Sequence, residues 1–170
     1  MNVWDAIRTK RAVRHFTLEP LSDAHIQRIL EAGRRSQSSK NSQPWHFIAV
    51  QDHDILQKIG ALDPNLSHVG RAAFCVVLVV PVENERTLWH FFDSGQSAAY
   101  MQLAAQEIGV GSCLGTIYHV DEARALLGLP PEWQARLLIS FGYPDPTHQR
   151  TGQGKAGRRG FEDVVHWNRW

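Results

Sequence analysis

Cysteine is scarce in this chain of 170 residues, and this and other shortages exclude several classes of protein. The two cysteines, Cys75 and Cys113, lie in apolar surroundings and form no Cys-x-x-Cys motif, so neither a disulfide framework nor a zinc site is expected. No apolar run approaches the ~18 residues that span a membrane, and the N-terminus lacks an apolar core of signal-peptide length. We therefore expect a soluble, cytoplasmic protein.

Net charge is also low, at +1, which predicts no general attraction to nucleic acid or anionic membranes. Positive charge gathers only locally, at residues 8–14 and 149–159. The nine histidines have no ligand spacing, and neither a Ser-His-Asp arrangement nor a carboxylate pair stands out. We expect no bound metal. If the protein is an enzyme, a cofactor carries the reactive atom.

Hydrophobic periodicity predicts helices and strands that alternate along a single domain. Residues Phe74–Val80 are seven consecutive apolar residues, mostly β-branched, which is typical of a strand buried on both faces. Helices separated by four or five strands indicate a sheet covered on both sides. The other expected elements are a helix ending near Lys10, a helix capped by Ser22, a strand at Trp45–Val50, a helix at Asp54–Ile59, a long helix at about Thr87–Ile108, a strand at Ser112–Ile117, a helix at Val120–Leu127 and a strand at Arg136–Phe141.

The long predicted helix at residues 87–108 carries apolar residues on more than one side. One stripe contains Trp89 and Phe92, another contains Phe91 and Ala98, and small residues fill the middle. A helix of this kind is usually buried all round. Two interpretations follow: a second subunit covers one side, or the helix is the central core of a single chain.

Two segments point to a ligand. Residues 38–47 read Ser-Ser-Lys-Asn-Ser-Gln-Pro-Trp-His-Phe, so a dense group of polar side chains directly precedes an apolar strand. Such groups are costly to bury unpaired, and they are either solvated in a turn or used by a bound molecule. Residues 10–16 read Lys-Arg-Ala-Val-Arg-His-Phe. In this order and at this distance, the two segments resemble the N-terminal signatures of the nitroreductase family, whose enzymes are built around flavin mononucleotide (FMN).

The resemblance covers nearly all of the single domain 1–170 and implies a fold, a partner and a reaction. The implied fold is α+β, a three-layer α/β/α sandwich with a mixed, mainly antiparallel sheet. Two chains would form an intertwined homodimer with FMN at the interface and NADH or NADPH as electron donor. A nitroaromatic, quinone or related small-molecule acceptor would be reduced in a ping-pong cycle. Flavin N5 would carry the chemistry, so no catalytic side chain is expected.

The resemblance assigns FMN contacts to the basic residues of the first segment. The first two basic positions of the family pattern hold the phosphate, and the one three residues later reaches the N1–O2 edge of the ring; here these are Lys10, Arg11 and Arg14. Ala12 stands where relatives commonly have a phosphate-binding serine, so phosphate binding has to rely more on charge. The alternative, that these cations complement a helix dipole, explains Lys10 and Arg11 but not Arg14.

In the second segment, the resemblance implies that Ser38, Ser39 and Asn41 contact FMN bound chiefly by the other subunit. Gln37 stands where a proline often precedes the two serines in relatives. On composition alone, a solvated turn is the competing interpretation, because Ser and Asn are common loop residues.

Two further regions are implied to meet the flavin ring. The amide of Asn65 can read the pyrimidine edge, and His68 takes a position where relatives often have a basic residue near N1 or O2; the alternative for both is an exposed loop. The Gly-rich segment 109–115 is not a dinucleotide loop, because it follows a helix and precedes a strand. In the family, this segment offers a backbone N–H to N5. The ring-edge candidates are Leu114, Gly115 and Thr116.

Residues 145–170 are predicted to be a docking segment. They start polar and Gly-rich and end in an aromatic stretch, and free tails are seldom so aromatic. The family has a second basic patch for the phosphate near its C-terminus, and we assign this contact to Arg158, with Arg159 as the fallback. A solvated charge pair is the alternative.

Other functions stay open. Members of the same superfamily carry out reductive dehalogenation, flavin destruction or azoline oxidation, but those branches usually have lid insertions or extra domains that this chain is too compact to show. A non-enzymatic alternative is an RNA- or protein-binding module that uses the basic patches and the Trp-rich C-terminus. Such a module would be colourless and bind in a salt-sensitive way, whereas a flavoprotein would be yellow.

Overall fold

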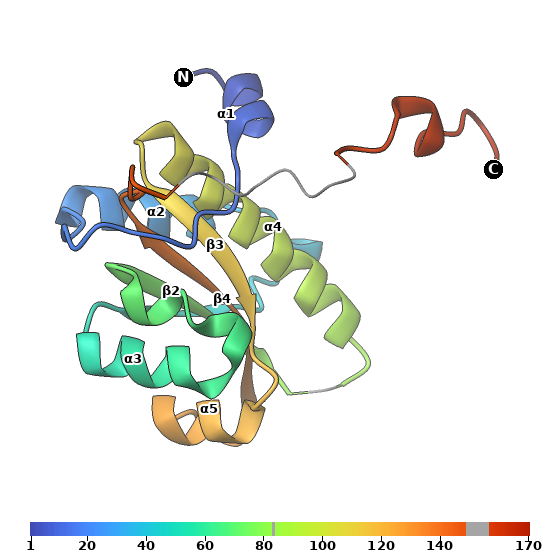
Figure 1. Ribbon diagram of the computed structural model, residues 1–170. Coiled ribbons are helices and arrows are strands. Elements are labelled where there is room, and N and C mark those ends of the chain that lie inside the picture. The colour runs from blue at the N-terminus through green and yellow to red at the C-terminus, as the bar shows by residue number, and fades with distance from the viewer. Residues whose placement is uncertain (83, 149–156) are drawn as a thin grey trace.

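The computed structural model describes residues 1–82, 84–148 and 157–170. The body of the chain is one sheet between layers of helices (Figure 1). The elements of the chain are α1 Val3–Thr9, α2 Asp23–Arg34, η1 Ser39–Asn41, β1 His46–Val50, α3 His53–Leu62, η2 Pro64–Leu66, η3 Val69–Arg71, β2 Phe74–Pro81, α4 Thr87–Glu107, β3 Gly111–Thr116, α5 Val120–Leu127, β4 Trp133–Gly142 and η4 Phe161–Asp163. Among these residues, no helix combines the length and apolarity needed to cross a membrane.

In the described residues the sheet has four strands in the order β1-β2-β4-β3, and every neighbouring pair is antiparallel. The one parallel contact seen there is a bridge between Ala12 and Ser112 at the outer edge of β3. The predicted mainly antiparallel sheet is confirmed, and its parallel part is limited to this bridge. Strand β2 lies inside the sheet and is almost wholly buried, as its apolar run predicted.

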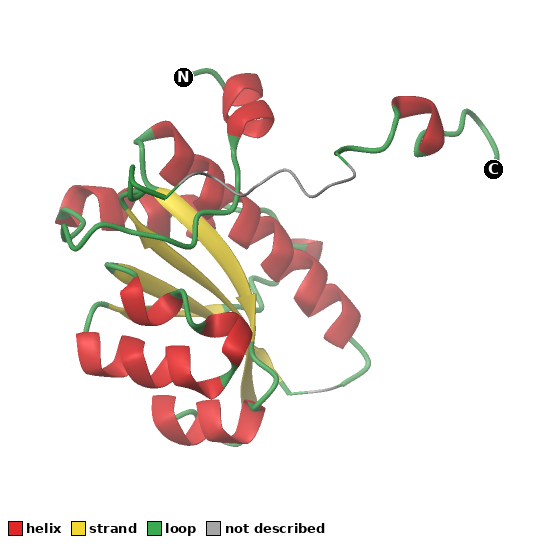
Figure 2. Cartoon of the chain, in the orientation of Figure 1, coloured by secondary structure: helices red, strands yellow, loops and turns green. Residues whose placement is uncertain are grey.

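Helices cover both faces of the sheet (Figure 2). On one face, α2 and α4 bring Ile29 and Met101 against Val76 and other residues of β2. On the opposite face, α3 and α5 bring Ile59 and Ala123 against the alternate residues of the same strand. Because successive side chains of a strand point to opposite faces, one apolar run supplies both cores. The predicted three-layer α/β/α sandwich is confirmed.

The helices α1, α2 and α3 each begin directly after a residue whose side chain caps them. Ser22 accepts the amide proton of the residue three positions on, as predicted for α2, and Asn2 does the same at the start of α1. Helix α3 begins at His53, earlier than the predicted Asp54, because Asp52 provides the cap. Strand β4 also begins earlier than predicted, at Trp133, since the end of β2 continues to pair with it.

Helix α4 is buried on one side only. Residues such as Ser97 and Met101 are packed inside the chain, whereas the opposite side is exposed. The interpretation of α4 as a central core helix of a single chain is therefore wrong. The large exposed side chains of this face are Leu88, Trp89, Phe92 and Tyr100.

The described C-terminal residues 157–170 stand apart from the body of the chain (Figure 1). Trp167 is 73% exposed and Trp170 is 100% exposed, and the ring contact of Trp170 is with His166 of the same segment. Residues 149–156 of the predicted docking segment lie outside the described residues. Docking of this segment on another molecule stays a prediction.

Replacing Ile29 by Ala tests the α2–sheet packing. Ile29 is fully buried, and large-to-small changes at such sites cost about 2–5 kcal/mol of unfolding free energy. Urea unfolding of the variant checks the value. The control is Gln27→Ala on the exposed side of the same helix, expected to change the unfolding free energy by less than about 0.5 kcal/mol. Equal effects of the two changes would contradict the layer arrangement.

Candidate functional site

The first sequence segment lies along the outer edge of β3. The Val13 amide donates to the Ser112 carbonyl oxygen over 2.9 Å, next to the parallel bridge at Ala12. Gly111 permits this approach, because a Cβ there would lie 2.9 Å from the Val13 side chain. The basic residues on either side of Val13 are thereby held against the sheet.

Lys10 and Arg14 form a pair of neighbouring cations beside Cys113. Burial lowers the pKa of Lys10; the charge of the Cys113 thiolate opposes this shift, and the positive charge of Arg14 adds to it. Burial raises the pKa of Cys113 above its ordinary value, although Arg14 and Lys10 both oppose the shift. In the described parts of the chain, neither cationic side chain has a hydrogen bond or an ion pair. Adjacent cations without an anion are unfavourable unless an anionic ligand joins them.

Arg11 does not join this pair. Its guanidinium donates to the carbonyl oxygens of Arg8 and Lys10, at 2.9 and 2.8 Å, and so satisfies the C-terminal end of α1. For Arg11, the helix-end alternative describes this structure, and its contact with phosphate stays a prediction.

His68 lies next to Arg14 but is held neutral. The imidazole is only 5% exposed, and its Nδ1 lies 2.8 Å from the hydroxyl oxygen of Ser140. Burial, assisted by the charge of Arg14, lowers the pKa of His68 from 6.5 to about 4. The exposed-loop alternative is wrong for His68. A second cation near the flavin N1–O2 edge, as the family pattern suggested, is also not provided at neutral pH.

The edge of β3 is open at Leu114. The Ser112 carbonyl accepts from Val13, and the Thr116 carbonyl accepts from the Asn65 side-chain amide over 3.0 Å. Alternate residues of a strand direct their backbone groups to the same edge, so the Leu114 N–H points outward between these two contacts. Its side chain is 46% exposed.

Gly115 contributes differently from the other two ring-edge candidates. Its backbone faces β4, where it pairs with Leu138, so its N–H does not point to the open edge. A Cβ at Gly115 would lie 2.5 Å from Leu66. Gly115 therefore allows close packing beneath the edge, and the outward N–H groups belong to Leu114 and Thr116.

The second sequence segment lies at the other end of α4. The Ser39 amide donates to Asp93 in the first half of α4, whereas Thr9, next to Lys10, accepts from Gln106 in its last turn. Thirteen residues of helix separate the two contacts, roughly 20 Å at 1.5 Å per residue. Within one chain, the structure does not bring Ser38, Ser39 and Asn41 to the Lys10–Arg14 pair.

The C-terminal arginines are also away from this pair. Arg158 and Arg159 are exposed in the segment that stands apart from the body. The guanidinium of Arg159 donates to the carbonyl oxygen of Asp163 within its own turn. Phosphate contact by Arg158 or Arg159 stays a prediction.

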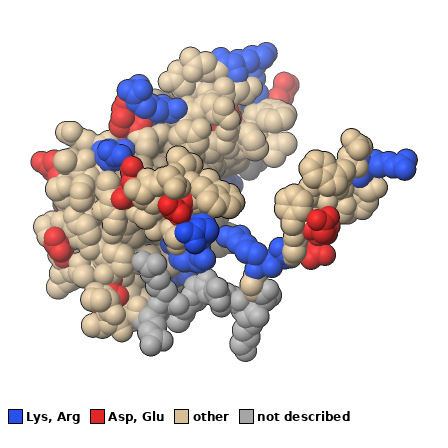
Figure 3. All heavy atoms as spheres, turned by 90° about the horizontal axis from the view of Figure 1, so that it is seen from above, with Lys and Arg blue, Asp and Glu red and all other residues tan. Residues whose placement is uncertain are grey.

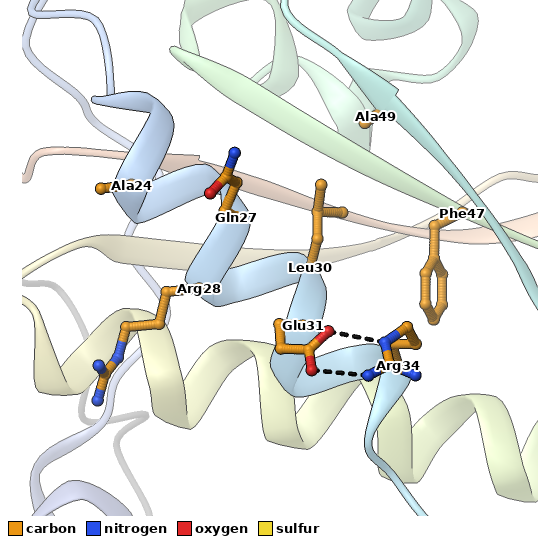
Figure 4. A pocket seen from close by; sticks show the side chains of 8 residues that line it. All are labelled: Ala24, Gln27, Arg28, Leu30, Glu31, Arg34, Phe47 and Ala49. Atoms are coloured by element: carbon orange, nitrogen blue, oxygen red, sulfur yellow. Dashed lines mark hydrogen bonds and ion pairs between the residues drawn. The ribbon is translucent and has the colours of Figure 1, made fainter.

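A different hollow contains none of the predicted site residues. This groove, of about 740 Å³, lies between α2 and β1, where Leu30 and Phe47 line it and Glu31 is bonded to Arg34 (Figure 4). On the face drawn in Figure 3, the Lys and Arg side chains form separate clusters and no continuous basic surface. Neither feature indicates a nucleic-acid site.

Sequence reasoning missed Ser140, and it could not foresee the charges near the buried Cys113. Ser140 is fully buried between Cys75 and Cys113 on the neighbouring strands. A lone hydroxyl in the apolar run 137–141 was the available signal, because such a group needs a buried partner, here His68. The charges acting on Cys113 come from residues about a hundred positions away and leave no local signal.

Comparison with known proteins identifies the family. The family model described as "Nitroreductase family" matches residues 7–63 and 61–143. The chain belongs to the nitroreductase family. A protein of Archaeoglobus fulgidus, provisionally named NADH dehydrogenase/NAD(P)H nitroreductase, is 29% identical over 170 residues, which cover 96% of each chain.

Solved structures with the nitroreductase fold agree closely with this chain. The FMN-dependent nitroreductase of Clostridium difficile R20291 has a TM-score of 0.86 at 22% identity and covers 98% of this chain and 99% of its own. The NADPH:FMN oxidoreductase of Vibrio harveyi, complexed with NAD⁺, has a TM-score of 0.87 at 25% identity and covers 100% of this chain and 78% of its own.

The residues of this nitroreductase-family chain fit an FMN molecule. Within the described part of the chain, Lys10 and Arg14 are cations without an anionic partner, which suits a phosphate and an electron-rich ring edge. The outward Leu114 N–H is a donor at the edge of a flat surface, and Asn65 supplies an amide beside it. The fit is incomplete in one chain, because Ser38, Ser39 and Asn41 lie at the far end of α4.

Buried neutral His68 predicts a specific pH dependence of stability. Between pH 6.5 and about 4, His68 is protonated in the unfolded chain but neutral in the folded chain, because folding lowers its pKa. The unfolding free energy therefore falls as the pH drops through this window, by about 2 kcal/mol at pH 5. Urea unfolding of the flavin-free protein at pH 7 and pH 5 measures the loss. His68→Asn should lose about 2 kcal/mol less than the wild type, and equal losses would contradict a neutral buried imidazole.

Proposed function

We propose that this protein is an FMN-dependent oxidoreductase that uses NADH or NADPH to reduce small-molecule acceptors such as nitroaromatics and quinones, and that it works as a homodimer. The observation that carries the proposal is the pair of neighbouring cations, Lys10 and Arg14, which lie beside the open edge of β3 and have no anionic partner among the described residues. Membership of the nitroreductase family and the relatives named for NAD(P)H and FMN support it. They favour an enzyme over an RNA- or protein-binding module.

When bound, FMN would supply two-electron chemistry at N5, accepting hydride from the nicotinamide nucleotide and returning electrons to the acceptor. The work of the protein is binding and charge stabilisation. Lys10 provides a point charge for the phosphate, and Arg14 donates toward the N1–O2 edge, where its charge favours the reduced state. The Leu114 N–H donates toward N5 and orients the ring. Since His68 is neutral, the tuning of the flavin potential depends on Arg14.

The homodimer is supported by the geometry of α4. The loop 38–43 and the Lys10–Arg14 pair lie at opposite ends of this helix, so one chain cannot direct both at the same flavin. A two-fold partner, placed antiparallel along α4, brings the loop of each chain to the cations of the other. The exposed apolar face of α4 is large for a free surface and suits such an interface. We further propose that the aromatic residues of segment 157–170 dock on the second copy.

The test of function is spectroscopic. Protein purified with added FMN should be yellow, bleach on anaerobic addition of NADH or NADPH, and regain colour with a quinone or nitroaromatic. Arg14→Ala should weaken FMN binding about 10- to 100-fold, because hydrogen bonds to charged groups contribute about 1.5–3 kcal/mol, and it should lower the flavin potential. Fluorescence titration and redox titration measure these two effects.

The control is Arg124→Ala on α5, which removes an arginine paired with Asp121. It should leave FMN affinity and potential unchanged. A colourless protein with salt-sensitive RNA binding would contradict the proposed function. An Arg14→Ala variant with normal affinity and potential would remove Arg14 from the site.

The dimer has its own prediction at Gly95. This residue lies on the exposed face of α4, and a Cβ there would meet no atom of its own chain within 4 Å. Gly95→Arg should favour the helix by about 1 kcal/mol in a monomer, yet insert a charge into the interface. Sedimentation should therefore change from dimer to monomer. Ala125→Arg, on an exposed position of α5, is the matched control and should remain dimeric. A Gly95→Arg dimer would exclude this face.

A further inference from the structure

The segment from Gly33 to Ser42 runs antiparallel alongside the first half of α4. The Ser97 hydroxyl donates to the Gly33 carbonyl oxygen over 3.1 Å, and further along the Ser39 amide donates to Asp93 Oδ2 over 3.0 Å. This seam places side chains of α4 beneath the loop that the proposed function assigns to FMN.

A continuous chain of hydrogen bonds crosses the seam on both sides of Ser38. The side-chain amide of Gln37 donates to Gln96 Oε1 over 2.7 Å, and the side-chain amide of Gln96 donates to Asp93 Oδ1 over 3.2 Å. Asp93 Oδ2 then accepts from the Ser39 backbone. Asp93 is only 3% exposed, and both oxygens of its buried carboxylate accept hydrogen bonds. One oxygen holds Ser39 directly, and the other holds Gln37 through Gln96.

The held loop is strained. Lys40, Asn41 and Gln43 have φ values of 53°, 55° and 46°. This is the left-handed region, which residues other than glycine adopt at a cost of about 1–3 kcal/mol each. Strain of this kind persists only where surrounding contacts determine the conformation.

The three hydrogen bonds that backbone amides of the loop donate within it all end on Ser38 or Ser39. Ser38 accepts from the Asn41 amide through its carbonyl and from the Gln43 amide through its hydroxyl, and the Ser39 carbonyl accepts from Ser42. The hydrogen bonds through Asp93 and Gln96 in turn hold Gln37 and Ser39, the residues on either side of Ser38. The strained conformation of the loop therefore depends on α4.

We propose that Asp93 and Gln96 are positioning residues that hold loop 38–43 in the conformation that binds the flavin of the partner subunit. The inference rests on the proposed function for the identity of the ligand. Neither residue touches the ligand itself. Gln96 acts through Gln37, by restricting the backbone just before Ser38, and Asp93 acts through the amide of Ser39.

Two measurements test the proposal, one of them without flavin. In the flavin-free protein, amide hydrogen exchange at Ser39 should rise about 10-fold in Gln96→Leu and in Asp93→Asn. The FMN dissociation constant should rise about 3- to 10-fold in each variant, because each loses or weakens a hydrogen bond of ordinary strength. Gln27→Leu, the same chemical change on the exposed side of α2, should alter neither quantity.

A rescue experiment separates positioning from general destabilisation. Proline at position 37 restricts the backbone without a side-chain hydrogen bond. It also removes the backbone N–H of Gln37, but this group donates no backbone hydrogen bond within the described residues. Gln37→Pro should therefore restore FMN affinity in the Gln96→Leu protein but not in the Asp93→Asn protein. Destabilisation without a positioning role would not be rescued in this selective way.

The outcomes are distinguishable from those of the proposed function. Faster exchange at Ser39 with unchanged FMN affinity would overturn the positioning role of Asp93 and Gln96. The proposed FMN-dependent function would still stand. Failure of Gln37→Pro to restore affinity would overturn the role of Gln96. If no variant and no wild-type protein binds FMN, the proposed function fails, and the exchange data still report whether Asp93 and Gln96 hold the loop.

Discussion

The candidate site depends on one contact, the hydrogen bond from the Val13 amide to the Ser112 carbonyl oxygen at the edge of β3. It attaches an otherwise irregular segment to the sheet, and it is possible because Gly111 has no side chain at the point of approach. Lys10 and Arg14 are consequently held close to each other and to the buried Cys113. The fold thus maintains an electrostatically unfavourable pair of cations, and an anionic ligand that contacts both would relieve the repulsion.

Helix α4 has two separate roles in this arrangement. Its buried side packs on α2 and the sheet and determines where the loop 38–43 lies, through Asp93. Its exposed side carries large apolar side chains that do not belong to the core of its own chain. Because the helix separates the loop from the cations by its own length, the same element that completes the monomer leaves the site unfinished. A second copy is the simplest source of the missing half.

The neutral state of His68 gives the site a particular charge balance. A lysine at this position would add a charge, whereas an imidazole bonded to Ser140 adds only a hydrogen-bonding ring. Arg14 both depresses the pKa of His68 and stands as the exposed cation beside it. The positive potential felt by a ligand here therefore comes from Lys10 and Arg14 rather than from His68.

Local patterns in the sequence determined the elements of this protein. The apolar run of β2, the cap at Ser22 and the spacing along α4 each depend on neighbours within a few residues, and the structure has the elements they predict. The two basic and polar segments indicated the family for the same reason. Only the tertiary structure decided that His68 is buried, that Gly115 faces β4 while Leu114 faces outward, and that one side of α4 stays uncovered. These properties depend on which distant residues meet and on strand register, and no short window of sequence contains that information.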